Sequence, residues 1–67
     1  MLKVEAKNRI REIRRARGLR QVDLARIVGV FQSEISEIEN GKRRPSVYLA
    51  KKIAKALRVS LDDLFSA

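Results

Sequence analysis

The chain has 67 residues, a formal net charge of +8, and neither cysteine nor histidine. A chain of this length forms one domain, residues 1–67, and buries only about 60% of its unfolded surface, which leaves no room for a deep catalytic cleft. The missing side chains exclude disulfides, thiol chemistry and the common zinc sites, so we expect no enzyme activity, no cofactor and no metal.

The longest apolar runs are too short to span a membrane, and the N-terminus lacks the apolar region of a signal peptide. We therefore expect a cytoplasmic protein with no membrane partner.

The positive charge lies toward the two ends of the chain. Residues 1–20 carry eight Lys or Arg against two acids, residues 41–67 carry seven against two, and residues 21–40 carry one against four. A basic rim around a less basic centre fits a DNA-binding protein, because cations hold phosphates at any sequence while base recognition needs other side chains. The solvated surface of a small charged domain is the competing interpretation.

The spacing of apolar residues predicts three helices in the first forty residues. The first runs from about Glu5 to Arg17. The second covers about Gln21–Val28 and the third about Gln32–Asn40. Gly29 between them can take the positive φ that ends a helix.

Two further helices follow a basic loop. Ser46 is a good N-cap for a helix that ends near Leu57. Ser60, with Asp63 three residues later, resembles a capping box that opens a short last helix. Because no strand pattern appears in the sequence, we predict an all-α domain of five helices.

Residues 21–40 read QVDLARIVGVFQSEISEIEN and are the most informative part of the chain. Leu24, Ala25 and Val28 form one apolar stripe, and Ile35 and Ile38 form a facing one, so two short helices can pack across a tight turn. Such a unit presents the outer face of its second helix to a DNA groove.

A wider pattern includes this unit and extends to both sides of it. It consists of these short segments: Ile10-Arg11, Arg14, Gly18-Leu19, Gln21, Leu24-Ala25, Gly29-Val30, Ile38-Glu39-Asn40-Gly41, Pro45-Ser46 and Ile53-Ala54. With this pattern the chain resembles the Cro/phage-repressor type of helix-turn-helix, the Xre family, over about residues 8 to 65. The resemblance implies a compact five-helix, lambda-repressor-like domain that binds DNA sequence-specifically, usually as a dimer.

The third predicted helix carries the candidate base contacts. Its two isoleucines face inward, and its N-terminal tip is the end that enters a major groove deepest. The resemblance implies base reading at several positions, where Gln prefers the adenine edge and Glu accepts from cytosine N4. The alternative is that one or two of these side chains contact only phosphate or water. The candidates are Gln32, Ser33, Ser36 and Glu37.

Three cations directly after this helix favour a phosphate clamp over a solvated turn. A narrow minor groove also attracts arginine, so Arg43 or Arg44 is suited to that site too. The resemblance implies that the residue opening the second helix contacts phosphate and braces the third helix. The candidate phosphate contacts are Gln21, Asn40, Lys42, Arg43 and Arg44.

Arg14 and Glu39 each lie four residues after an isoleucine of an apolar face. A lone buried charge is costly, so opposite charges at such positions should pair. The resemblance implies the same pair. We therefore predict a structural ion pair that positions the third helix without contacting DNA.

Three positions depart from the family pattern. Arg20 and Phe31 stand where the family usually has a capping Ser or Thr, and losing such a cap costs roughly 0.5–2 kcal/mol. We expect Phe31 to offset this loss by packing, with contact to a thymine methyl as the alternative. Arg58 replaces the usual glycine after the fourth helix, so it must take a positive φ or end the helix differently.

We predict a homodimeric transcription regulator that places the 32–40 helix in successive major grooves of a palindromic double-stranded DNA operator. Phage-type repressor, restriction-modification controller and antitoxin-like autorepressor fit the sequence equally well. The alternative class is an antitoxin-like protein-interaction module with autoregulatory DNA binding. No small-molecule effector is evident. The predicted dimer interface consists of apolar residues in excess of one small core: Leu49, Leu61, Leu64 and Phe65.

Overall fold

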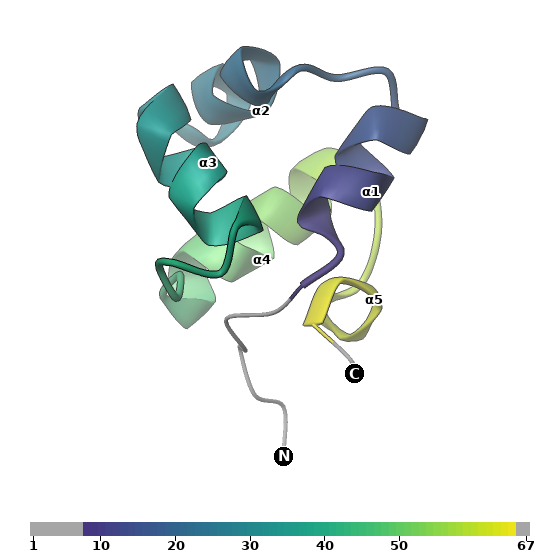
Figure 1. The fold of residues 1–67 in the computed structure, drawn as a ribbon. Helices are drawn as coiled ribbons and strands as arrows, with labels where there is room; N and C mark the ends of the chain where they lie inside the picture. Colours follow the sequence, from purple (N-terminus) through teal and green to yellow (C-terminus); the bar gives the residue numbers. More distant parts are fainter. Residues whose placement is uncertain (1–7, 66–67) are drawn as a thin grey trace.

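The computed structural model describes residues 8–65, and within this range the chain forms five helices and no strand (Figure 1). The prediction of an all-α, five-helix domain is confirmed. In chain order the helices are α1 (Ile10–Ala16), α2 (Gln21–Val28), α3 (Gln32–Glu39), α4 (Val47–Leu57) and α5 (Leu61–Phe65).

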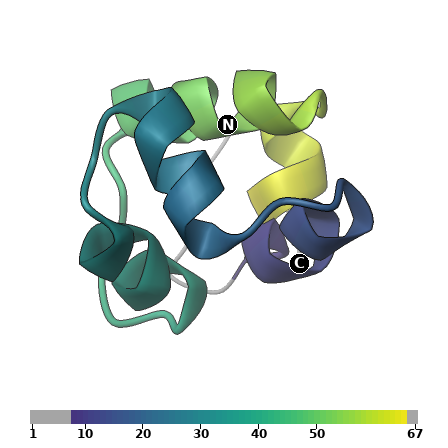
Figure 2. The same ribbon diagram turned by 90° about the horizontal axis from the view of Figure 1, so that it is seen from above.

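The five helices enclose one apolar core. Figures 1 and 2 show α2 and α3 on one side of the molecule, α1 and α5 on the other, and α4 extending from the first pair to the second. Each helix contributes a buried apolar side chain, as helical spacing requires of a domain with a single core. The largest fully buried side chains are Ile10, Leu24, Val28, Ile35, Ile38, Ile53, Leu57 and Leu64.

The first helix starts later than predicted. Asn8 and Arg9 are not helical, and α1 begins at Ile10. The Asn8 side chain explains this: its Oδ1 accepts from Ile10 N (3.0 Å), and its Nδ2 donates to Ile38 O (2.9 Å). An asparagine bonded in this way competes with helical backbone. The expected start at Glu5 lies outside the described residues.

The ends of the central helices use left-handed backbone. Gly29 has φ +80° and closes α2, where both Gly29 N and Val30 N donate to Ala25 O. Arg58 takes φ +62° after α4, a region that a residue with a Cβ adopts at a cost. α4 therefore ends in the usual left-handed geometry although it lacks the usual glycine.

The helix N-termini are capped unevenly. Ser46 Oγ accepts from Leu49 N (3.0 Å), and Ser60 and Asp63 form the expected reciprocal pair of bonds (3.0 and 3.1 Å). Arg20 provides no side-chain cap, but its backbone N–H donates to Asp23 Oδ2 at 2.8 Å. Bonds from the Arg20 side chain and backbone lower the pKa of Asp23 to about 2.

The prediction that Phe31 packs against the protein is wrong. Its side chain neither caps α3 nor packs, because 77% of the residue is exposed. Ile27, Val47 and Tyr48 are the other large apolar residues that stay exposed in the described part of the chain.

The prediction that four apolar residues exceed the needs of one small core and form a dimer interface is also wrong in part. Leu64 and Phe65 are buried in the core of the protomer itself, at 0% and 4% exposure. They are therefore not available as a free dimer surface. Leu49 and Leu61 are half-buried and pack against the same core.

Candidate nucleic-acid interface

α3 turns its isoleucines inward and its polar side chains outward. Ile35 and Ile38 are buried, which fixes the rotation of the helix about its axis. Gln32 and Ser33 are exposed at its N-terminal end, and further along the same helix Ser36 and Glu37 are half-buried. The four candidate base contacts thus share the part of α3 that the core leaves uncovered.

The loop after α3 folds back onto that helix. Gly41 takes φ +74°, and the backbone N–H groups of Lys42 and Arg43 both donate to Glu37 O, at 2.9 and 3.3 Å. Lys42, Arg43 and Arg44, the three cations of this loop, are exposed, and the backbone bonds place the first two next to Glu37 of α3. This is the arrangement that a phosphate clamp next to a base-reading helix requires.

A buried ion pair holds the inner side of α3. Arg14 Nε lies 2.6 Å from Glu39 Oε2, and the two side chains expose 6% and 0% of their surface. Arg14 Nη2 also donates to Glu39 Oε1 (3.1 Å), and Arg14 Nη1 donates to Leu19 O (2.8 Å). The pair predicted from the apolar spacing is present and joins α1 to the end of α3.

Burial alone would raise the pKa of Glu39, because it disfavours the charged carboxylate. Hydrogen bonds from Arg14, Gln21 and Arg11, together with the charge of Arg14, outweigh burial, and the pKa lies below its usual range. Glu39 is therefore a carboxylate in the folded protein at neutral pH.

Gln21 extends this buried network to the N-terminal end of α3. Its Nε2 donates to Glu39 Oε1 at 3.1 Å, and its Oε1 accepts from Gln32 Nε2 at 3.5 Å. A side chain that opens α2 thus braces both ends of α3. The expected role of Gln21 as a phosphate contact stays a prediction.

Arg11 belongs to the same network, and the predicted Arg14–Glu39 pair did not include it. Arg11 Nε donates to Glu39 Oε1 at 3.2 Å, and Arg11 Nη2 donates to Asn40 Oδ1. The signal was its position three residues before Arg14, which places both arginines on neighbouring parts of α1. Asn40 is thereby held at the C-terminal end of α3.

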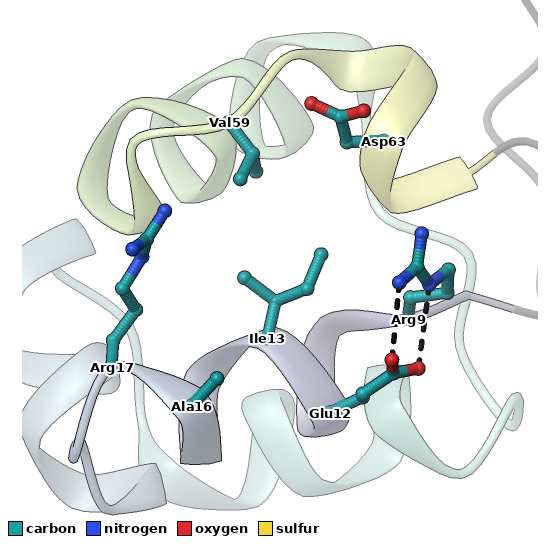
Figure 3. A pocket seen from close by; sticks show the side chains of 7 residues that line it. All are labelled: Arg9, Glu12, Ile13, Ala16, Arg17, Val59 and Asp63. Carbon is teal, nitrogen blue, oxygen red and sulfur yellow. Dashed lines mark hydrogen bonds and ion pairs between the residues drawn. The ribbon is translucent and has the colours of Figure 1, made fainter.

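A pocket opens on another part of the molecule, between α1 and the segment from α4 to α5 (Figure 3). Two of its charged residues bond to each other, since Arg9 donates twice to Glu12 (3.3 and 3.0 Å). Arg17 Nε donates to Leu57 O at 2.9 Å. The lining contains no residue of α2 or α3, so the pocket is separate from the candidate interface: Arg9, Glu12, Ile13, Ala16, Arg17, Val59 and Asp63.

Residues 8–65 contain no group of three or more His, Cys, Asp or Glu side chains that could hold a metal ion. None of the helices described is both long and apolar enough to cross a membrane.

Comparison with known proteins decides the family. Residues 10–64 match the family model HTH_3, described as Helix-turn-helix. The chain belongs to the helix-turn-helix family. This confirms the predicted Xre/Cro-like type, whose members are DNA-binding transcription regulators.

Several known proteins are similar to this helix-turn-helix protein over most of their own length. An HTH-type transcriptional regulator from Archaeoglobus fulgidus is 44% identical over 59 residues, which cover 88% of this chain and 84% of that protein. The restriction-modification controller protein C.AhdI from Aeromonas hydrophila has a TM-score of 0.78 at 36% identity, covering 82% of this chain and 83% of that one. SinR, a master regulator for biofilm formation solved in complex with DNA, has a TM-score of 0.74 at 33% identity, covering 79% and 86%.

Proposed function

We propose that the protein regulates transcription by inserting α3 into the major grooves of a palindromic operator as a homodimer. The observation that carries this proposal is the two-sided character of α3. Its inner side is fixed by buried isoleucines and by the Arg14–Glu39 pair, while its outer side presents polar groups beside three exposed cations. A rigid helix of this kind can hold side chains in register with base edges.

The base contacts proposed are Gln32, Ser33, Ser36 and Glu37, and the phosphate contacts are Gln21, Asn40, Lys42, Arg43 and Arg44. The similarity to SinR, whose structure contains DNA, supports a DNA-facing role for the equivalent surface. Gln21 and Asn40 fit phosphate contacts because internal bonds to Glu39 and Arg11 already hold them at the two ends of α3.

The dimer is proposed with a smaller apolar contribution than the sequence indicated. Leu49 and Leu61 remain candidates because each keeps part of its surface outside the core. In such a dimer the two copies of α3 should lie about 34 Å apart, one turn of DNA, to match successive major grooves.

Selection of bound sequences from a random duplex library tests the proposal. We expect a palindromic consensus with half-sites one helical turn apart. Sedimentation of the protein with the selected duplex should then give two protomers per site. A consensus without symmetry, or one protomer per site at saturation, would contradict the proposed dimer, and the absence of any consensus would contradict sequence-specific reading.

A further inference from the structure

Glu37 and Arg43, assigned above to different tasks, form one unit. Arg43 Nε donates to Glu37 Oε1 at 2.9 Å, while the two side chains keep 52% and 45% of their surface exposed. The backbone holds them together as well, because Lys42 N and Arg43 N both donate to Glu37 O. The pair is therefore built into the turn that follows α3.

The pairing changes what Glu37 can do near DNA. An isolated carboxylate is repelled by the phosphates of the duplex, and a guanidinium at hydrogen-bonding distance cancels most of that repulsion. Arg43 occupies one carboxylate oxygen, Oε1, and leaves Oε2 as an acceptor. It also fixes the direction in which that oxygen points.

The pairing also changes what Arg43 can offer. Its Nε is engaged by Glu37, but the N–H groups on its two Nη atoms remain as donors in a planar fork. The exposed edge of the pair thus presents an acceptor beside donors. In the major groove a C·G base pair presents the complement, the N4 donor of cytosine beside the O6 and N7 acceptors of guanine.

We propose that Glu37 and Arg43 act as one specificity-determining unit for a C·G base pair. Glu37 Oε2 accepts from cytosine N4, and the Nη groups of Arg43 donate to the guanine edge. Arg43 is in this view a positioning and reading residue, unlike the neighbouring Arg44, which is a phosphate contact. The inference rests on the proposed insertion of α3 into the major groove.

The test compares Glu37→Gln, Arg43→Ala and the double variant with Arg44→Ala as the matched control. Each is titrated with the selected operator, with an operator whose C·G pair in each half-site is replaced by T·A, and with a scrambled duplex. Thermal melting of each variant checks that it is folded. We expect every variant to fold, because the substituted side chains are at least partly exposed.

We expect the wild type to prefer the C·G operator by about 10- to 100-fold, the range of one good bidentate contact. Glu37→Gln and Arg43→Ala should each remove most of this preference, and the double variant should lose no more than either. Arg44→Ala should weaken binding to all three duplexes by the same factor and keep the preference.

Arg43→Lys separates charge from geometry, because lysine keeps the cation but lacks the planar fork. We expect it to lose the C·G preference while holding its affinity for scrambled DNA. If Arg43→Ala instead behaves like Arg44→Ala, or the selected operator contains no C·G pair whose replacement matters, the inference is overturned and sequence-specific binding still stands. If the wild type selects no operator, both proposals fall.

Discussion

α3 carries two glutamates that each pair with an arginine, and the two pairs have opposite surroundings. Glu39 is fully covered and bonded to Arg14 from α1, whereas Glu37 is half-buried and bonded to Arg43 from the adjoining loop. Two residues along a helix correspond to a rotation of about 200°, so the two carboxylates lie on nearly opposite sides of α3. One glutamate–arginine pair therefore positions the helix on its inner side, and the other, as we propose, reads DNA on its outer side.

Burial decides which task each pair can perform. Removing one partner of a covered pair leaves an uncompensated charge in the interior, while an exposed pair can be broken because water solvates both groups. The inner pair, Arg14 and Glu39, should thus govern folding, and the outer pair, Glu37 and Arg43, should govern binding.

The largest effect should come from breaking the inner pair. Arg14→Ala or Glu39→Ala should each reduce the free energy of unfolding by roughly 3–5 kcal/mol, because either leaves one buried charge without its partner. Replacing both by apolar residues of similar volume should cost much less than the sum. Urea denaturation of the four proteins measures this coupling, and strict additivity would show that the pair contributes nothing as a unit.

Protonation should weaken the inner pair more gently, because a neutral Glu39 still accepts hydrogen bonds. Its pKa is lower in the folded protein than the unfolded value of about 4.3. Its contribution is therefore fully present above about pH 4.3 and is lost as pH falls through the folded pKa. The unfolding free energy of Glu39→Gln, followed between pH 7 and pH 2, should decline less than that of the wild type. Equal declines would mean that Glu39 does not couple folding to pH.

The outer pair should separate affinity from selectivity. Glu37→Ala should weaken operator binding by about 1–3 kcal/mol, the range of one good base contact. Without the carboxylate, Arg43 becomes an unpaired cation that attracts phosphate, so the same variant should bind unrelated DNA more tightly. Titrations at several salt concentrations measure both terms, with Arg44→Ala as a control that flattens the salt dependence by about one unit of slope. An unchanged base preference in Glu37→Ala would mean that α3 does not read sequence at this position.

The smallest effect should be the contribution of the outer pair to folding. Glu37 and Arg43 are about half exposed, and such pairs contribute about 0.2–1 kcal/mol. A double-mutant cycle on the unfolding free energy of Glu37→Ala and Arg43→Ala should therefore give a coupling well below that of Arg14 and Glu39. A coupling as large as the inner one would remove the distinction between the two pairs.

Much of the inner side of α3 could be predicted from the sequence, because the core repeats with helical spacing. The bounds of α2 agree with the prediction, α3 ends one residue early, and Arg14 and Glu39 pair as their places on apolar faces require. A residue on an apolar stripe can face only the interior, so its surroundings follow from the pattern alone.

The outer side could not be predicted in the same way. Arg11, Arg43 and Asn8 have long or polar side chains whose partners are 28, 6 and 30 residues away, so the path of the chain selects them. The same holds for Leu64 and Phe65, whose burial depends on how α5 packs rather than on their spacing. Nothing in the sequence indicated that the side chain of Phe31, which directly precedes α3, would stay exposed.

Arg58 has a consequence for how this domain could be retargeted. Its left-handed backbone carries a cost that a glycine would not have, so Arg58→Gly should raise the melting temperature. Changes that give a recognition helix a new target usually reduce stability, and a protein close to its stability threshold tolerates few of them. A residue after α4, outside the proposed DNA contacts, could therefore determine how many new operators the surface of α3 can be evolved to recognise.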